Sequence, residues 1–379
     1  MKNKVLTVLY FWKGCLRLLK SSTVFTIKGT RKRYPKVIQL PITYRCNAKC
    51  VMCNIWKMDH SNETTLDEFG GFMKDPIFKK VEAVGINGGE PTLLPNLVEY
   101  AEEIIKLPSL KSLNIISNGY SSKLLFKNAE KIYKVCKGKG IKFHISISLD
   151  GVGAVHNVVR GVPIAFEKVI VTLDELIKNK QKYCDSYDIG ATIVNQNINH
   201  LIELDQYARW KGYNIKYRLG IENKRIESNK LNHSYSVIHG PNRQGAKEFF
   251  HYQMTQATDL ASRFKYYSIF CWLNDDTPKR KLGCAWKEEG VTLDAKGNIY
   301  YCAVESDCIG TLRNGKGEEI FFDKKNIEYR KHIIKNRCNN CIHDYTGKPQ
   351  FINVLLFLAD VIKNRFAMNI YFVKARFLK

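Results

Sequence analysis

The sequence predicts an α/β fold built around a parallel sheet. Short runs of apolar and β-branched residues alternate with stretches of helical periodicity, and six such units follow one another as far as Gly220. A parallel sheet of this kind, open or closed, places its functional loops at the carboxyl ends of its strands. The predicted strands are 37–44, 81–87, 112–117, 142–148, 187–194 and 214–220.

Helices are predicted between these strands and ahead of the first one. Residues 5–20 form an amphipathic pattern, with Trp12 among the apolar residues and Lys13 and Arg17 on the opposite face. This helix either covers an open end of the sheet or anchors the protein at a membrane surface. The helices predicted between the strands include 96–106, 122–136, 163–179 and 199–211.

The alternation of predicted strands and helices ends near Gly220, and the amino-acid composition then changes twice. A polar stretch is followed by a Cys- and Gly-rich segment, in which residues 296–298 form the predicted turn of a hairpin. The last segment is apolar and basic, but its apolar run is too short to span a bilayer. The predicted divisions are an N-terminal helix and lead-in (1–36), an α/β core (37–221), a linker with a helical connection (222–283), a Cys-rich domain (284–345) and a basic apolar tail (346–379).

The charge is strongly positive, with 60 Lys and Arg against 36 Asp and Glu and a formal net charge of +24. No acidic residue occurs before Asp59. Such a field favours anionic partners, which include small-molecule and lipid-linked substrates and a membrane surface, while no specific nucleic acid is expected. No cleavable signal peptide is recognised, so we expect a cytoplasmic protein, with peripheral contact to the inner face of the membrane left open.

Cys46, Cys50 and Cys53 follow the first predicted strand directly, in the spacing C-x3-C-x2-C. Three thiolates on one loop can bind three irons of a [4Fe–4S] cubane, and the fourth iron is then free to chelate a small molecule. Zinc is the alternative. Three sulfurs leave zinc one ligand short, and His60, the nearest histidine, has an unusual spacing.

With these cysteines, motifs at successive strand ends make the sequence resemble the radical S-adenosylmethionine (SAM) superfamily. Gly88-Gly89-Glu90-Pro91 resembles the motif that binds the methionine amine in that family, and Ser117-Asn118-Gly119 ends the third strand. By this resemblance the residues that contact SAM are Gly88, Gly89, Glu90, Pro91, Asn118, Ser146, Ser148, Asp150 and Arg160.

The resemblance implies a partial (β/α)6 TIM-like barrel as the radical SAM core. It also implies a SAM-binding [4Fe–4S] cluster that is reduced by a partner such as flavodoxin or ferredoxin. The reduced cluster cleaves SAM to methionine and a 5′-deoxyadenosyl radical, which abstracts a hydrogen from the substrate. No residue that handles the substrate radical is identified from the sequence.

A second set of cysteines comprises Cys284, Cys302, Cys338 and Cys341. Their spacing resembles the twitch domain, a short form of the SPASM extension, and implies one auxiliary [4Fe–4S] cluster with four thiolate ligands. Cys308 is close enough in sequence to replace one of the four. A zinc ribbon remains the alternative for this segment.

These features predict a radical SAM oxidoreductase that oxidises or epimerises a sugar-like, lipid-linked or nucleotide-linked substrate. Maturation of a ribosomal peptide or protein, by oxidation or crosslinking, is the second hypothesis, although the roughly 36 residues ahead of the first strand are few for a leader-binding domain. An iron–sulfur electron-transfer protein is the third. The Gly88-Gly89-Glu90 motif argues against it, because an electron carrier does not need a site for methionine.

Overall fold

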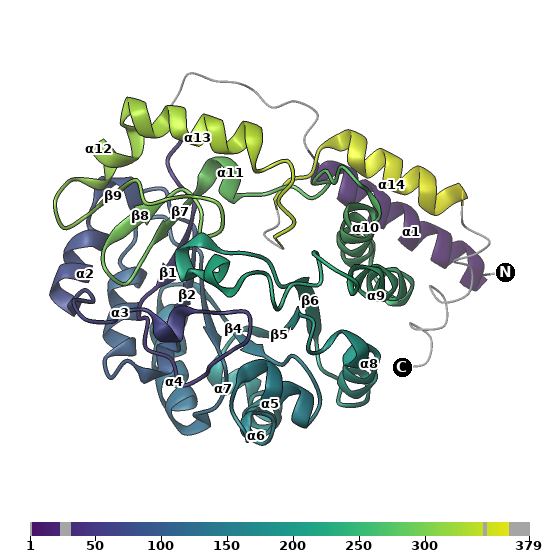
Figure 1. The fold of residues 1–379 in the computed structure, drawn as a ribbon, viewed down its shortest axis with the longest axis horizontal. Helices are drawn as coiled ribbons and strands as arrows, with labels where there is room; N and C mark the ends of the chain where they lie inside the picture. The colour runs from purple at the N-terminus through teal and green to yellow at the C-terminus, as the bar shows by residue number, and fades with distance from the viewer. Residues whose placement is uncertain (1, 23–31, 344–346, 364–379) are drawn as a thin grey trace.

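The fold is described from a computed structural model, which covers residues 2–22, 32–343 and 347–363. Most of the predicted lead-in (23–31) and half of the predicted C-terminal tail (346 and 364–379) lie outside the described residues. Within the described residues, the strands form one continuous sheet, and helices pack around it (Figure 1).

The sheet has nine strands in the order β6-β5-β4-β3-β2-β1-β7-β8-β9. The first six are parallel and lie in sequence order, which confirms the predicted α/β fold and the partial, unclosed barrel. The strands are β1 (Val37–Pro41), β2 (Ala83–Asn87), β3 (Ser112–Ser117), β4 (Lys142–Ser148), β5 (Ser186–Ile193), β6 (Ile215–Leu219), β7 (Gly290–Leu293), β8 (Asn298–Tyr300) and β9 (Gly310–Thr311).

Helices follow the barrel strands as the periodicity predicts, because their apolar stripes cover the sheet. In α4, for example, Leu125, Ala129, Ile132 and Cys136 recur at helical spacing and are all buried. The helices are α1 (Lys2–Lys20), α2 (Leu66–Met73), α3 (Leu97–Ile105), α4 (Ser122–Gly138), α5 (Ala154–Arg160), α6 (Ala165–Lys178), α7 (Lys180–Tyr183), α8 (Leu201–Trp210), α9 (Arg243–Gln256), α10 (Leu260–Asn274), α11 (Trp286–Glu289), α12 (Gly317–Phe322), α13 (Lys324–Asn336) and α14 (Phe351–Lys363).

The Cys-rich segment continues the barrel sheet. Strand β7 pairs in parallel with β1, with Val37 opposite Gly290, and β8 then turns back antiparallel to β7. The tight turn between β7 and β8 contains Gly297, whose φ of 84° favours glycine. The predicted hairpin is therefore present, and it covers the β1 edge of the barrel.

Helices α1, α10 and α14 form a separate layer on the side of the molecule away from α2 and α12 (Figure 1). Their shared core includes Cys15, Phe264 and Phe357. Trp12 and Leu16, on the outer side of α1, are about half exposed, at 53% and 54%. Within the described residues, no helix combines the length and apolarity needed to cross a membrane.

Candidate functional site

The loop of Cys46, Cys50 and Cys53 begins a few residues after β1, at the carboxyl edge of the barrel. Two backbone bonds fix the chain just ahead of it, since Gly89 N–H donates to Thr43 O at 2.7 Å and Glu90 N–H donates to Arg45 O at 2.8 Å. A Cβ on Gly89 would lie 2.0 Å from the Arg45 carbonyl oxygen. Glycine is therefore required here because two backbones approach so closely.

A second backbone segment clamps the same loop from the end of α5. Lys49 N–H donates to Arg160 O and Val51 N–H donates to Val159 O, both at 3.0 Å. Gly161 follows with a φ of 62°, and a Cβ there would meet Lys49 O at 2.4 Å. The three cysteines are thus held between the β2 loop on one side and the end of α5 on the other.

The three thiols lie close enough to influence one another electrostatically. Burial, together with the charges of the neighbouring cysteines, raises the pKa of Cys46 to about 11 and that of Cys53 to about 12. Burial also raises the pKa of Cys50, against the opposing positive charge of Arg160. Thiols in such a setting ionise when a metal group supplies the compensating positive charge.

Glu90 joins the end of β2 to the end of β3 from a fully buried position. Its Oε1 accepts hydrogen bonds from Thr92 N–H, Thr92 Oγ1 and Ser117 Oγ, while its Oε2 accepts one from Asn118 N–H at 2.8 Å. Burial raises the pKa of this carboxyl group, although the four donors oppose the shift. Oε2 therefore keeps capacity for a further donor such as an ammonium group. Pro91 begins the short 3-10 helix η3 (Pro91–Leu93), which Glu90 caps.

Asn118 connects β3 directly to the cysteine loop. Its Nδ2 donates to Asn47 Oδ1 at 2.7 Å, and its Oδ1 accepts from Tyr120 N–H at 3.0 Å. Asn47 lies next to Cys46 in the chain, so this side-chain pair fixes the loop at its start. No motif along the chain marks Asn47 or Tyr120 as a site residue.

Arg160 and Asp150 form a buried ion pair beside Cys50. The Arg160 Nε lies 2.6 Å from Asp150 Oδ2, and Arg160 Nη1 lies 3.6 Å from Cys50 Sγ. Burial alone would lower the pKa of Arg160, but the charges of Asp150 and Cys50 outweigh it and raise that pKa above its usual value. His156 accepts from Asp150 N–H, and burial holds its pKa well below the usual range, so the ring is neutral.

The two serines of β4 have different surroundings. Ser148, at the end of the strand, is buried near Asp150 in sequence and shares its edge of the sheet. Ser146 lies two residues earlier, and its hydroxyl donates to Asp188 Oδ1 on β5 at 2.7 Å. Ser148 therefore lies at the strand end, whereas the hydroxyl of Ser146 is already bonded to the neighbouring strand β5.

Several buried polar atoms at this edge have no hydrogen-bond partner in the described structure. They include Tyr120 Oη, Asn87 Oδ1 at the end of β2, and Asn54 Oδ1 beside Cys53. Buried polar atoms are normally satisfied, so unpaired ones close to a cysteine loop are what a ligand site presents. With the thiolate set, they fit a site for an iron–sulfur cluster and a polar organic molecule.

The four predicted auxiliary cysteines also come together, although they come from three separate segments. Burial raises the pKa of Cys302, and the charge of Cys284 adds a smaller contribution. Burial and the charges of Cys302 and Cys284 raise the pKa of Cys338 to about 12. Burial also raises the pKa of Cys341 to about 12, and the charge of Cys302 contributes to the rise. Cys308 is exposed and its Sγ lies 3.4 Å from Gly310 O, while no auxiliary cysteine contributes to its pKa.

Two arginines lie beside these four thiols. Arg280 donates to the carbonyl oxygens of Cys341 and His343, at 3.0 and 2.8 Å, and so fixes the turn that carries the last cysteine. Arg330 is 8% exposed and its guanidinium lies 4.6 Å from the centre of the Tyr301 ring. Burial lowers the pKa of Arg330 to about 10, despite the opposing charges of Tyr301 and Cys302.

These surroundings fit an anionic thiolate-ligated group. A four-thiolate cluster supplies the negative charge that a buried guanidinium requires. Within the described residues, no three His, Cys, Asp or Glu side chains are close enough to hold a single metal ion.

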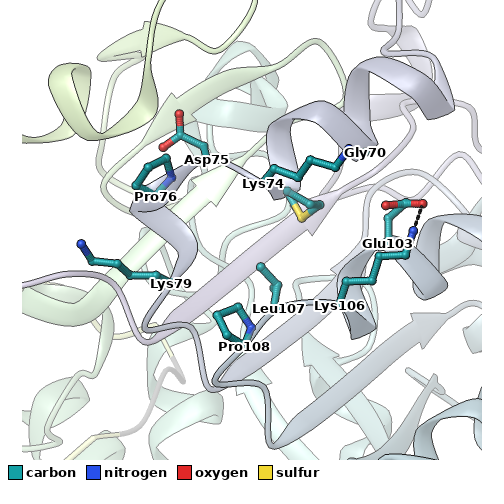
Figure 2. A pocket seen from close by; sticks show the side chains of 10 residues that line it. Gly70, Lys74, Asp75, Pro76, Lys79, Glu103, Lys106, Leu107 and Pro108 are labelled. Carbon is teal, nitrogen blue, oxygen red and sulfur yellow. Dashed lines mark hydrogen bonds and ion pairs between the residues drawn. The ribbon is translucent and has the colours of Figure 1, made fainter.

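A surface hollow of about 260 Å³ lies at the opposite end of the barrel, between α2 and α3 (Figure 2). Lys79 and Pro108, which line it, precede β2 and β3, so the hollow faces the amino ends of the strands. Glu103 and Lys106 at its rim pair with each other. Because functional loops of a parallel barrel lie at the carboxyl ends, this hollow is separate from the cysteine site.

Residues 40–208 match the Radical SAM superfamily. Among curated relatives, the GTP 3′,8-cyclase of Alkaliphilus oremlandii is 28% identical over 178 residues, which cover 45% of this chain and 49% of that protein. The pre-heme d1 synthase of Dinoroseobacter shibae is 27% identical over 179 residues, covering 47% of this chain and 40% of that protein. The chain thus matches about half the length of these relatives or less.

Solved structures resemble the whole fold at low sequence identity. The structure of anSMEcpe with bound AdoMet superimposes with a TM-score of 0.54 at 17% identity, covering 89% of this chain and 99% of that one. Streptococcus suis SuiB bound to the precursor peptide SuiA gives a TM-score of 0.55 at 16% identity, covering 79% and 67%. These similarities establish the architecture alone. Members of the Radical SAM superfamily, which residues 40–208 match, use a [4Fe–4S] cluster and SAM.

Proposed function

Since this chain carries a radical SAM domain at residues 40–208, we propose that Cys46, Cys50 and Cys53 hold the [4Fe–4S] cluster at which SAM is cleaved. The observation that carries this proposal is the double clamp on the cysteine loop. A backbone atom of Gly89 bonds to the chain just ahead of the loop, one of Arg160 bonds to the loop itself, and both residues are predicted SAM contacts. This arrangement supports a site in which the three thiolates and the predicted SAM contacts act together.

When bound, a reduced cluster would supply the one electron needed to cleave SAM into methionine and a 5′-deoxyadenosyl group. The protein's own task is to orient SAM and exclude water. Glu90 Oε2 and Asn87 Oδ1 offer acceptors for the methionine ammonium, and Arg160 offers positive charge for its carboxylate. The pairing of Arg160 with buried Asp150 keeps the guanidinium fixed in position while Cys50 is ionised.

We also propose that Cys284, Cys302, Cys338 and Cys341 hold an auxiliary [4Fe–4S] cluster. Their mutual electrostatic coupling and the buried Arg330 beside them support four anionic ligands. A cluster whose four irons all have protein ligands cannot chelate substrate, so its role is to take up or relay an electron. This role favours an oxidation, in which the substrate radical loses a second electron, and with it an oxidoreductase.

The substrate class proposed is an anionic small molecule, such as a sugar-like, lipid-linked or nucleotide-linked compound that is oxidised or epimerised at a carbon bearing OH or NH. The relatives named GTP 3′,8-cyclase act on a nucleotide, which supports this class, as does the positive charge of the chain. Peptide maturation is the second candidate, because the SuiB structure that shares this fold contains a precursor peptide.

Anaerobic reconstitution with iron and sulfide tests the proposal. We expect roughly eight irons per chain and release of 5′-deoxyadenosine from SAM with dithionite or reduced flavodoxin. Changing Cys46, Cys50 and Cys53 together to Ala should halve the iron and abolish the release. A wild-type protein that binds four irons contradicts the auxiliary cluster, and one that releases no 5′-deoxyadenosine contradicts the enzymatic function.

The outer side of α1 and α14 is the proposed contact with an anionic membrane surface. Trp12, Leu16, Ile352 and Leu356 are 52–55% exposed there, and Lys13 and Arg17 are also exposed on α1. Flotation with vesicles containing anionic lipid should fall when Trp12 and Leu16 are both changed to Ser. Equal flotation of the two proteins would eliminate the membrane contact.

A further inference from the structure

Arg225 is a buried cation for which the described protein provides no direct counter-charge. It lies in the 3-10 helix η5 (Lys224–Ile226), beyond β6, and is only 7% exposed. Its Nε and Nη1 atoms are buried and neither has a hydrogen-bond partner among the described residues. An arginine side chain stays charged at any physiological pH, and a buried charge without a partner is strongly unfavourable. Something outside the described protein is therefore expected to meet this guanidinium.

The position of Arg225 relates it to both cysteine sites. Ile226, next to it, packs in a cluster with Tyr44 and Ile55 that also contacts Cys46 and Cys53 of the first site. Lys224 N–H, on its other side, donates to Val304 O at 3.2 Å, two residues after Cys302 of the second site. Burial raises the pKa of Cys53, and the positive charge of Arg225 opposes that rise, which places Arg225 near the first site. Arg225 therefore lies on a segment that joins the two sites.

Asp294 is a carboxylate in the neighbourhood of Arg225, since the charges of both influence the pKa of Tyr44 and of Tyr300, and its acceptor capacity is already used. Its Oδ2 accepts from Tyr44 Oη, Tyr300 Oη and Asn298 Nδ2 at 2.8–3.0 Å. Its Oδ1 accepts from the backbone N–H groups of Lys296 and Asn298, both at 2.9 Å. No ion pair joins it to Arg225 in the described structure. Asp294 thus orients Tyr44 and Tyr300 and does not pair with Arg225. The Nε and Nη1 groups of Arg225 remain available to another anion.

We propose that Arg225, on the segment that joins the two cysteine sites, binds a carboxylate or phosphate oxyanion of the substrate. This inference rests on the proposed function, because a substrate that reacts with the radical at one site and passes an electron to the other has to lie between them. A guanidinium offers two parallel N–H groups that match such an oxyanion. The buried and unpaired Asn223 Oδ1, two residues before Arg225, adds an acceptor for a substrate hydroxyl or amine.

The test uses the reconstituted holoenzyme with SAM, and inorganic phosphate and acetate as probes. Each anion replaces chloride at constant ionic strength, and the thermal midpoint is followed through the visible absorbance of the clusters. We expect a saturable rise in the midpoint with at least one of the two anions. Arg225→Met should bind the anion more weakly, so that the half-saturating anion concentration rises by a factor of ten or more. The matched control is Arg33→Met, since Arg33 is an exposed arginine paired with Glu288, and it should keep the wild-type response.

Separate outcomes contradict separate parts of the argument. An equal response in wild type and Arg225→Met, or no saturable response in wild type, overturns the proposal while leaving SAM cleavage intact. If Arg225→Met loses the iron of Cys46, Cys50 and Cys53 but keeps the auxiliary iron, Arg225 is instead the counter-charge of the first cluster and the proposal is wrong. If wild type releases no 5′-deoxyadenosine, the proposed function fails first.

A second variant covers the case in which Arg225→Met does not fold. Arg225→Lys keeps the positive charge but loses the planar pair of N–H groups. Its affinity for the anion that stabilises wild type should fall several-fold at unchanged iron content. Wild-type affinity for both anions in Arg225→Lys would overturn the proposed two-point contact.

Discussion

The two cysteine sites of this protein are held in different ways. The first three cysteines share one short loop, and backbone bonds from two other segments fix it at positions where glycine allows close approach. The other four come from three segments, and side chains of Arg280 and Arg330 lie around them. The first site is thus positioned mainly by main-chain contacts. The second combines a close backbone approach at Gly283 and Gly347, beside Cys284, with the side chains of two arginines. Main-chain positioning tolerates almost no change at its contact points, whereas charge can be altered without moving the chain far.

The largest expected effect is that of Gly89→Ala on the first site. The added Cβ would meet the Arg45 carbonyl oxygen at 2.0 Å, so the loop ahead of Cys46 has to move. A displacement of about 1 Å at a reacting centre costs on the order of 100-fold in rate, and we expect a loss of that size in 5′-deoxyadenosine release. Iron at the auxiliary site should be retained.

Gly85→Ala is the matched control, because Gly85 lies on β2, the strand that precedes Gly89, and an added Cβ there meets nothing within 4 Å. It should release 5′-deoxyadenosine at close to the wild-type rate. If Gly89→Ala behaved like Gly85→Ala, the main-chain clamp would not position the cluster, and the contrast between the two sites would disappear.

Cys338→Ala is expected to separate the two sites. Loss of a thiolate ligand should remove the auxiliary cluster, so that iron falls from roughly eight to four per chain while SAM cleavage continues. Conversion of substrate to an oxidised product should stop, since no acceptor remains for the second electron. Iron analysis and product analysis by mass spectrometry provide the readouts.

Cys308→Ala is the control for that experiment. The Cys308 thiol is exposed and receives no influence from the four auxiliary cysteines, so its removal should leave both iron and product unchanged. Loss of four irons in Cys308→Ala would mean that Cys308 is a ligand and that the assignment of the four cysteines is wrong.

The same difference explains how far the sequence could predict each site. The six strands lie within a few residues of their predicted places, because alternating and helical apolar patterns are local signals. The spacing within the loop of Cys46 is also local, and so are the strand-end motifs. By contrast, the pairing of β7 with β1, and the approach of Arg225 and Arg330 to the cysteines, depend on contacts between distant segments. No pattern along the chain marks such contacts.

Ser146 shows the same limit within the barrel. The sequence places it near a strand end with Ser148, and both lie on the same side of β4 by alternation. Only the register of β4 with β5 places Ser146 opposite Asp188, which accepts the hydrogen bond of its hydroxyl. Which of two serines reaches a ligand is therefore decided by the neighbouring strand.

A comparison of Arg160→Met with Arg330→Met measures how the two buried arginines affect stability. Removing Arg160 leaves buried Asp150 without its partner, and such a loss costs about 3–5 kcal/mol. Removing Arg330 from protein without clusters eliminates a poorly compensated charge and one cation–π contact, so the expected change is within ~1 kcal/mol. Urea unfolding of the two cluster-free variants gives both values.

The double variant Arg160→Met with Asp150→Asn tests the cause of the larger effect. If the cost comes from an unpaired carboxylate, neutralising that carboxylate should restore part of the stability lost in Arg160→Met. No recovery would show that Arg160 stabilises the fold by packing alone. A loss of several kcal/mol in cluster-free Arg330→Met would contradict the view that the second site carries uncompensated charge.

The smallest expected effect concerns acid stability of the barrel wall. Burial would raise the pKa of Asp188, but hydrogen bonds from His144, Lys216 and Ser146 outweigh it and hold that pKa below its usual value. The stabilisation is therefore present above the unfolded-state pKa of about 4 and is lost as the pH falls through the folded-state pKa. Wild type should exceed Asp188→Asn by about 1–2 kcal/mol at pH 6, and the difference should shrink steadily below pH 4. Unfolding of the two cluster-free proteins by urea at pH 6 and at pH 3 measures it. If the difference in unfolding free energy were the same at pH 6 and pH 3, Asp188 would contribute through its shape and not its charge. Stabilisation by buried charge would then be confined to the cysteine sites.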